Sequence, residues 1–414
     1  MIGDIIVGVD IGSSKVTTVI AKSRKQYQME VLGCGSAPTV GIKKGLIVDI
    51  ESVAEAVKKS ISMAERTANV RVAEVYLGIT GLHVLTVSSH GAIQLGSTQK
   101  EITNEDIKKV LQDCKDFDIP LDKQVVDIIP HQYIVDGYDE IIDPIGMRGT
   151  ILEVDADVVL GNTIAVNSMI KCVERAGYEV GGMILETLAT SNVVLTDEEK
   201  ELGVILIDVG AGKTDISYYK GKRLKYYDSI SVGSEHITND IVIVLKVSYN
   251  EADKLKKQFS FAEKSLITHD QDVSIYSLSE NKQMDIKVSE VVEIIEARVS
   301  EIFRMVAEKI KVLELKENVS AGVVISGLGI YNVVGADKVA SKTLDLPVRL
   351  FNPNLPGKLG FEYVTALGIV KYIGNMKAGK NDMEILNMIN IGSEESPKIT
   401  GKGLLEKFIQ FLKQ

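Results

Sequence analysis

Apolar residues along this chain follow two periods, one typical of strands and one typical of helices. Short β-branched runs occur at residues 5–9 and 16–21 and again at 75–80. Between the second and third runs, apolar residues of 49–64 recur every three or four positions behind Asp49, which predicts a capped helix. Alternating strands and helices of this kind predict an α/β fold.

The pattern changes between about residues 84 and 162. Thr103 and Asp106 form a capping box for a helix, and Pro120 closes that segment. Strands are predicted after it at 125–129, 132–135 and 150–160. We expect this stretch to form a small inserted subdomain of its own.

The second half has a helix-rich stretch at residues 235–304. A long helix is predicted from about 289 to 313, because its apolar residues are spaced by three and four. Such spacing is more typical of core packing than of a partner site. A buried strand at 323–326 then leads into Gly327, Leu328 and Gly329.

One local pattern occurs twice, at residues 9–15 (VDIGSSK) and 207–213 (IDVGAGK). Each copy reads as a strand, a tight small-residue turn and a returning strand, with an aspartate before the turn and a lysine after it. A single turn of this kind is most often only a hairpin. Repetition at the distance of one domain indicates a duplicated architecture and favours nucleotide binding.

The chemistry of these turns suits a phosphate clamp. Glycines let backbone N–H groups approach an anion, and successive N–H groups form an anion-binding concavity. An aspartate contacts phosphate only through a cation, so Asp10 and Asp208 imply Mg²⁺, held through water. Two such turns facing each other would grip a nucleotide from both sides, and residues 327–329 would form a wall beside the nucleoside.

The end of the chain is different in character. Residues from about 376 to 402 are predicted to be a flexible linker, because they carry too little apolar surface to fold alone. Residues 403–414 are amphipathic when wound as a helix, and lysines lie toward the other side or the edges. The apolar face consists of Leu404, Leu405, Phe408, Phe411 and Leu412. Such a short helix needs a surface, either the protein's own body or an anionic membrane, and the linker and lysines favour the membrane.

Composition narrows the function classes. The chain has 414 residues, 45% hydrophobic and 25% charged, which is ordinary for a folded protein of two or more domains. The net charge of −10 argues against a general nucleic-acid surface. Three scattered cysteines and five histidines suggest neither disulfides nor structural zinc. The chain begins without a secretory pattern and contains no apolar run of spanning length, so we expect a cytoplasmic location.

The repeated hairpin and the later strand-to-glycine turn resemble the actin-like ATPase superfamily and, within it, the FtsA family of bacterial cell-division proteins. Similar stretches include residues 8–15, 144–149, 173–177 and 208–216, and the inserted subdomain is the more diagnostic feature. The resemblance implies a ribonuclease H-like duplicated fold with two lobes around a nucleotide cleft. It implies four subdomains. The first core subdomain comprises residues 1–83 and 163–200 with about 356–375, and residues 84–162 form the inserted subdomain. Residues 201–234 and 305–355 form the second core subdomain, and residues 235–304 form the helix-rich subdomain.

The resemblance also implies residue roles. The phosphate motifs match Asp10, Gly12, Ser13, Ser14, Lys15, Asp208, Gly210, Ala211, Gly212, Lys213 and Thr214. Gly233 and Ser234 match the ribose loop, and Asp253 and Lys256 border the adenosine. Glu186 falls where a carboxylate stands near the attacking water, which makes Glu186 and Asp208 the candidate catalytic residues.

Two departures from the family pattern bear on activity. The family usually has a threonine where this chain has Lys213. It usually has consecutive glycines in the nucleoside turn, where this chain has Leu328. The lysine is expected to strengthen phosphate binding and the leucine to narrow the base pocket. ATP and Mg²⁺ are the expected ligands, and turnover is left open.

The function implied is an ATP-binding, self-associating adaptor that tethers the FtsZ ring, with other divisome proteins, to the cytoplasmic face of the membrane at the division site. The FtsZ contact would lie within residues 235–304. A small-metabolite kinase and a pilus-assembly actin-like protein are the alternatives, and neither has a role for an amphipathic tail.

Overall fold

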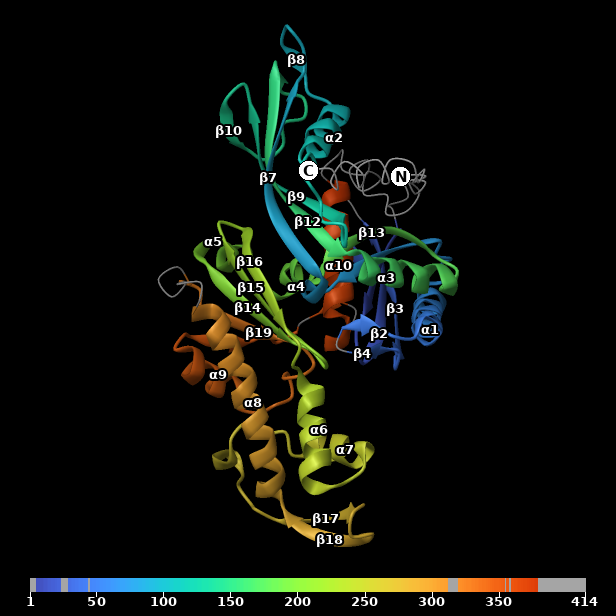
Figure 1. The fold of residues 1–414 in the computed structure, drawn as a ribbon, viewed down its shortest axis with the longest axis vertical. Coiled ribbons are helices and arrows are strands. Elements are labelled where there is room, and N and C mark those ends of the chain that lie inside the picture. The colour runs from blue at the N-terminus through green and yellow to red at the C-terminus, as the bar shows by residue number, and fades with distance from the viewer. Residues whose placement is uncertain are drawn as a thin grey trace, which may run out of the picture.

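The computed structural model describes residues 5–23, 29–43, 45–311, 319–353, 355–356 and 359–378. Two five-stranded sheets lie in the middle of the molecule, with a smaller sheet at one end and a helix-rich unit at the other (Figure 1). We call the two large sheets with their helices the first lobe and the second lobe. The predicted helix at 403–414, and the predicted linker beyond residue 378, lie outside the described residues.

The first-lobe sheet has the strand order β13-β6-β1-β2-β3. Its strands are β1 (Ile5–Ile11), β2 (Lys15–Ser23), β3 (Met29–Pro38), β6 (Glu74–Ile79) and β13 (Glu179–Leu185). β1, β2 and β3 pair antiparallel, whereas β6 pairs parallel with β1 and with β13. The central strands are buried on both faces, which explains their continuous apolar runs.

The second-lobe sheet repeats this topology in the order β16-β15-β14-β19-β20. Its strands are β14 (Val204–Val209), β15 (Thr214–Lys220), β16 (Arg223–Ile230), β19 (Val323–Ser326) and β20 (Val348–Leu350). The first three again pair antiparallel and the last two parallel. The repeat seen in seven residues of sequence therefore extends to a whole sheet, as a duplicated fold requires.

Helices cover both lobes. They are α1 (Ile50–Ala68), α3 (Thr163–Ala176), α4 (Glu186–Val194), α5 (Asp197–Leu202), α9 (Ala336–Leu344) and α10 (Val364–Ala378). α10 packs against α4 and β1, where a Cβ added at Gly8 would lie 2.4 Å from the Ala366 carbonyl oxygen. The end of the described chain thus returns to the first lobe. One apolar cluster contains Ile6 and Ile373 from the first lobe and Tyr219 and Val324 from the second, so a shared core joins the lobes.

The inserted subdomain has its own sheet, in the order β10-β9-β12-β7. Its elements are β7 (Val84–Gln94), β8 (Lys100–Glu101), α2 (Asn104–Asp113), β9 (Lys123–Val135), β10 (Tyr138–Ile141), β11 (Arg148–Gly149) and β12 (Ile151–Asn162). The capping box of Thr103 and Asp106 is confirmed. The prediction of separate strands on either side of Pro130 was wrong: β9 runs through the proline, and the ladder to β12 shifts register there.

The helix-rich unit extends from the second lobe. It contains α6 (Ser234–Leu245), α7 (Tyr249–Gln258), β17 (Asp272–Ser277), β18 (Lys282–Lys287) and α8 (Val288–Lys311). Val292, Ile295 and Val299 of α8 are fully buried in the same core as the second-lobe sheet, which confirms core packing as the reason for their spacing. The remaining elements are the short strands β4 (Ile42–Lys43) and β5 (Leu46–Ile47) and the single 3₁₀ turns η1 (Gly81–His83), η2 (Lys264–Leu266) and η5 (Phe361–Tyr363). None of the helices within the described ranges is both long and apolar enough to cross a bilayer.

Candidate functional site

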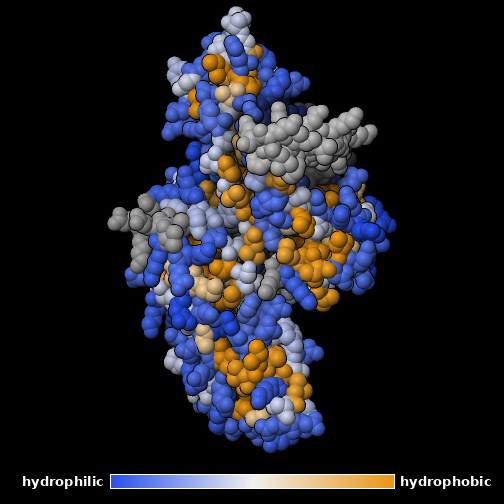
Figure 2. Space-filling view, viewed as in Figure 1, coloured by the Kyte–Doolittle hydropathy of each residue, from blue (hydrophilic) through white to orange (hydrophobic). Residues whose placement is uncertain are grey.

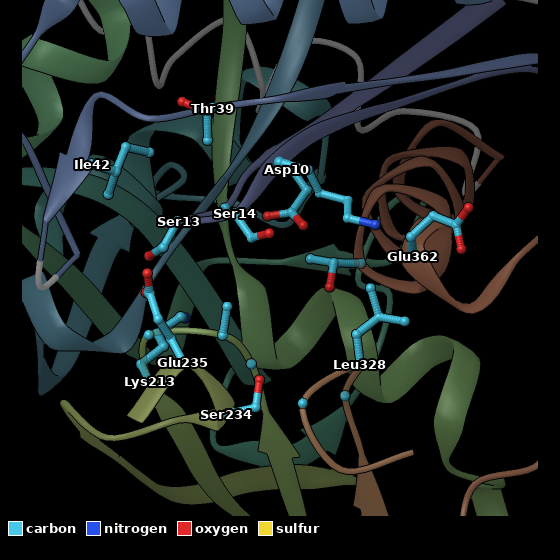
Figure 3. A pocket seen from close by; sticks show the side chains of 18 of the residues that line it. Asp10, Ser13, Ser14, Thr39, Ile42, Lys213, Ser234, Glu235, Leu328 and Glu362 are labelled. Carbon is cyan, nitrogen blue, oxygen red and sulfur yellow. The ribbon is translucent and has the colours of Figure 1, made fainter. Parts of the chain in front are cut away.

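A cavity of about 770 Å³ lies between the two lobes. Its walls include residues 10–15 at the end of β1, which we call the first glycine turn. They also include Asp208 and residues 210–213 at the end of β14, and we call residues 208–213 the second glycine turn. Residues 327–329 after β19 form the third glycine turn on the same cavity. Figure 3 shows Asp10, Ser13 and Ser14 on one wall, with Ser234 and Leu328 on the opposite wall.

The first two turns are built in the same way. The Gly12 N–H donates to the Lys15 carbonyl at 3.0 Å, and the Gly210 N–H donates to the Lys213 carbonyl at 2.9 Å. The turns also meet across the cavity, since a Cβ added at Gly212 would lie 3.0 Å from Ser13 Oγ. Two matched turns from different lobes therefore close on one space.

Two further loops of the second lobe pack directly on the second glycine turn. Ser234 N–H donates to the Gly210 carbonyl at 3.0 Å, and Gly329 N–H donates to the Val209 carbonyl at 2.8 Å. A Cβ at Gly233 would lie 2.5 Å from the Ala211 carbonyl oxygen, and one at Gly329 would lie 2.4 Å from that of Gly210. The small residues let the three loops act as one wall.

Several buried hydroxyls in the walls lack a hydrogen-bond partner. Among the described residues, buried side-chain oxygens of Thr17, Thr39, Ser326 and Asp127 have none, and the first three residues line the cavity. Buried polar groups are normally paired, so an orphaned group indicates a partner supplied from elsewhere. The cavity is thus equipped for a polar ligand.

The structure brings almost all the sequence-predicted site residues to this cavity. Its lining includes Asp10, Gly12, Ser13, Ser14, Lys15, Glu186, Asp208, Gly210, Ala211, Gly212, Lys213, Ser234, Asp253, Lys256, Gly327, Leu328 and Gly329. Thr214 and Gly233 are not part of the lining. Thr214 is fully buried and its hydroxyl donates to the Val232 carbonyl at 2.8 Å, while Gly233 packs behind the second glycine turn. Both residues support the wall from behind.

Carboxylates gather at one end of the cavity. Burial, and then the charge of Glu186, raises the pKa of Asp10 to about 8. Burial, and then the charge of Asp215, raises the pKa of Asp208 to about 7. Burial also raises the pKa of Glu186, although the nearby Lys213 opposes it. Bringing these carboxylates together costs free energy unless cations accompany them.

Lys213 supplies one such cation. Its Nζ lies 2.5 Å from Glu186 Oε2 and 2.5 Å from Asp215 Oδ2. Burial alone would lower the pKa of Lys213, but the charges of Asp215 and Glu186 raise it above its usual value. The expectation that Lys213 strengthens phosphate binding stays a prediction, since two of its three N–H groups are taken by carboxylates.

A second charged group in the cavity lining comes from α7. Lys256 Nζ donates to Thr238 Oγ1 at 2.6 Å and lies 3.5 Å from Asp253 Oδ1. Lys257 Nζ lies 2.5 Å from the other oxygen of Asp253. Burial lowers the pKa of Lys256. The bond to Thr238 holds α7 against α6, whereas the two Asp253 pairs lie within α7.

Sequence reasoning missed several lining residues, including Thr17, Thr39, Thr80, Asp215, Glu235, Tyr249, Asn332 and Glu362. Two of them carried a usable signal: Thr17 and Asp215 each stand two residues after the lysine that ends a glycine turn. A polar residue at the same place in both returning strands indicates a shared role. Asp215 Oδ1 accepts a hydrogen bond from the Ser229 hydroxyl. In the described parts of the chain, no three His, Cys, Asp or Glu side chains are arranged to hold a metal ion by themselves.

Comparison with solved structures identifies the architecture. The PilM-PilN type IV pilus biogenesis complex contains a chain that matches with a TM-score of 0.60 at 14% identity, covering 89% of this chain and 98% of that one. MreB5 of Spiroplasma citri bound to ADP matches with a TM-score of 0.55 at 13% identity, over 94% and 99%. With the duplicated sheet and the cavity between lobes, these likenesses define an actin-like fold.

Sequence comparisons are more specific. The family model described as "Cell division protein FtsA" matches residues 205–368, and the one described as "SHS2 domain inserted in FTSA" matches 81–160. Cell division protein FtsA of Bacillus subtilis is 33% identical, over 89% of this chain and 83% of that protein. Its counterpart from Pseudomonas aeruginosa is 30% identical, over 99% and 98%. The chain belongs to the FtsA family of cell-division proteins.

Proposed function

We propose that this protein binds ATP with Mg²⁺ in the cavity between its lobes. The observation that carries the proposal is the set of orphaned hydroxyls of Thr17, Thr39 and Ser326 in a cavity walled by two matched glycine turns. The turns offer backbone N–H groups to phosphates, and Asp10 and Asp208 would hold Mg²⁺ through water. The ion would neutralise phosphate charge. Glu186 would accept the proton of an attacking water, and Asp208 would orient the metal.

Two substitutions test the pocket. Asp208→Ala removes a partner of the metal, and Gly12→Val places bulk where even a Cβ would lie 3.0 Å from the Lys15 carbonyl oxygen. Each should weaken ATP binding at least about tenfold in equilibrium titration with Mg²⁺ present. Asp208→Ala loses a charged contact worth roughly 1.5–3 kcal/mol, and Gly12→Val blocks the approach of the backbone to the phosphates. Gly137→Ala, at a turn with no atom within 4 Å of the added Cβ, is the control. Unchanged affinity in both test variants would refute the assignment.

We further propose that the protein tethers the FtsZ ring to the cytoplasmic face of the membrane at the division site. Membership in the FtsA family supports this role, together with self-association and contact with other divisome proteins. The helix-rich unit at 235–304 would receive FtsZ. Figure 2 shows apolar side chains gathered on this unit near α6, where Ile243 and Val244 are 71% and 60% exposed. Such a patch is suited to a protein partner.

The tether itself would be residues 403–414, through the apolar face defined above. A chain ending at residue 402 should lose at least about 90% of its sedimentation with vesicles containing phosphatidylglycerol, because burial of the apolar face and roughly 1 kcal/mol per lysine are both removed. Sedimentation would be measured with and without ATP and FtsZ. Equal sedimentation of the full and shortened chains would end the tether proposal.

A matched pair of substitutions separates the apolar face from charge alone. Phe408→Asp and Gln410→Asp each add one negative charge, on the apolar and the polar face respectively. Phe408→Asp should release the protein from vesicles almost as fully as the truncation, whereas Gln410→Asp should weaken binding only by the roughly 1 kcal/mol expected of one charge. Transfer of phosphate to a small metabolite would instead support the kinase alternative, and family membership does not favour the pilus-assembly alternative.

A further inference from the structure

The ion pair between Lys213 and Glu186 joins the two lobes inside the cavity. Lys213 ends the second glycine turn, whereas Glu186 is the first residue of α4 in the first lobe. Only 20% of the Lys213 side chain and 13% of the Glu186 side chain are exposed, so water screens the pair weakly. Lys213 Nζ donates to Glu186 Oε2, and because both partners are charged this hydrogen bond is of the stronger, charge-assisted kind.

Asp215 fixes the lysine from the other side. Its Oδ2 lies 2.5 Å from Lys213 Nζ, while its Oδ1 accepts from the Ser229 hydroxyl on β16. The lysine is therefore held between a carboxylate of its own lobe and one of the opposite lobe. Removing the lysine would leave two shielded carboxylates without their cation, which makes the arrangement costly to break.

We propose that Lys213 restrains Glu186 and thereby slows ATP hydrolysis, acting as a positioning residue that keeps bound ATP intact. This inference rests on the proposed ATP binding. In hydrolysis, the water oxygen bonds to the terminal phosphorus, the bond from that phosphorus to the bridging oxygen breaks with its electron pair leaving on ADP, and the water's proton passes to Glu186. A carboxylate oxygen occupied by an ammonium group is a poorer proton acceptor, so the pair must loosen before this step.

The variant Lys213→Thr, in the full-length chain, tests the restraint. Phosphate release at saturating ATP and Mg²⁺ should rise at least about tenfold, since a positioned general base contributes 10²–10⁴-fold and freeing it should recover part of that factor. ATP affinity, measured separately by titration, should fall by a smaller factor than the factor by which kcat rises. Lys213→Arg keeps an ion pair and should retain slow release. Lys213→Thr combined with Glu186→Gln should lose the gain.

A second variant avoids leaving both Glu186 and Asp215 without a cation, which could disturb folding. Lys213→Thr with Asp215→Asn removes one of the charges and leaves Glu186, and the same rise in phosphate release is expected. As a comparator, Lys15→Thr removes the lysine of the first glycine turn, for which no carboxylate contact of this kind occurs in the described structure. It should lower ATP affinity with no rise in kcat.

The outcomes separate the two proposals. ATP binding by the wild-type chain with no rise in kcat in either Lys213 variant would overturn the restraint alone. A loss of affinity greater than tenfold at unchanged kcat would make Lys213 a phosphate ligand and would also overturn it. Failure of the wild-type chain to bind ATP in the titration would overturn both the restraint and the proposed function.

Discussion

Gly327→Ala should abolish most ATP binding and lower the stability of the second lobe. Gly327 has φ +103°, and an added Cβ would lie 2.2 Å from the Val209 carbonyl oxygen and 2.5 Å from Asp208 Oδ1. Backbone strain of about 1–3 kcal/mol and a clash of about 1–3 kcal/mol would both fall on the second glycine turn. We expect at least tenfold weaker binding by titration and a lower midpoint of thermal unfolding.

Gly177→Ala is the matched control for this result. Gly177 has φ +94° at the end of α3, but no atom lies within 4 Å of an added Cβ. The variant should lose only the roughly 1–2 kcal/mol typical of a left-handed residue and should bind ATP like the wild type. If Gly327→Ala behaves like Gly177→Ala, the third glycine turn is not part of the binding wall.

Asp127→Asn should remove a pH dependence of stability from the inserted subdomain. Asp127 on β9 is 3% exposed, its Oδ2 lacks a partner among the described residues, and its Oδ1 accepts only the N–H of Ile128 at 2.9 Å. Burial raises its pKa to about 7, although the bond from Ile128 opposes this. The folded state therefore holds a proton that the unfolded chain releases near its ordinary value of 3.8.

The difference in pKa between the folded and unfolded states sets the direction in which stability changes with pH. A raised carboxyl pKa gives stability that is fully present below the unfolded pKa and is lost as pH rises through the folded pKa, so the window runs from about pH 4 to 7. Between about pH 5.5 and 8, the wild-type chain should lose roughly 2 kcal/mol through this residue, whereas Asp127→Asn should not. Urea unfolding at the two pH values measures the difference. Asp139→Asn, at an exposed position on β10 of the same subdomain, should behave like the wild type. Equal pH dependence in wild type and Asp127→Asn would contradict the prediction.

Much of the fold was readable from local patterns. The capping box at Thr103, the cap at Asp49 and the core spacing of α8 all depend on residues within a few positions of one another. The prediction failed at Pro130 for a physical reason. Proline cannot donate to the ladder, so the sequence predicts a strand end there, but the sheet accommodates the proline where the ladder shifts register. Secondary-structure prediction from local sequence is least accurate where a neighbouring strand can accommodate an irregular residue.

The candidate site likewise has features that depend on neighbouring residues and features that the local sequence did not predict correctly. The two glycine turns were readable because a turn is specified by the few residues that form it, and the closing hydrogen bonds Gly12 to Lys15 and Gly210 to Lys213 span only three positions. In the returning strand after the second turn, the sequence prediction chose the wrong side chain for the cavity. Thr214 turned inward to Val232, and Asp215 beside it reached the cavity, because strand neighbours point to opposite faces of a sheet.

The sequence by itself determined the duplication, the two turns and the family, since each depends on residue types at fixed short spacings. Only the tertiary structure decided that Lys213 meets Glu186, that three buried hydroxyls line one cavity, and that Oδ2 of Asp127 has no partner within the described part of the chain. These facts depend on how closely the two lobes and the inserted sheet approach one another. That approach is set by packing between residues far apart in the chain, and no local pattern encodes it.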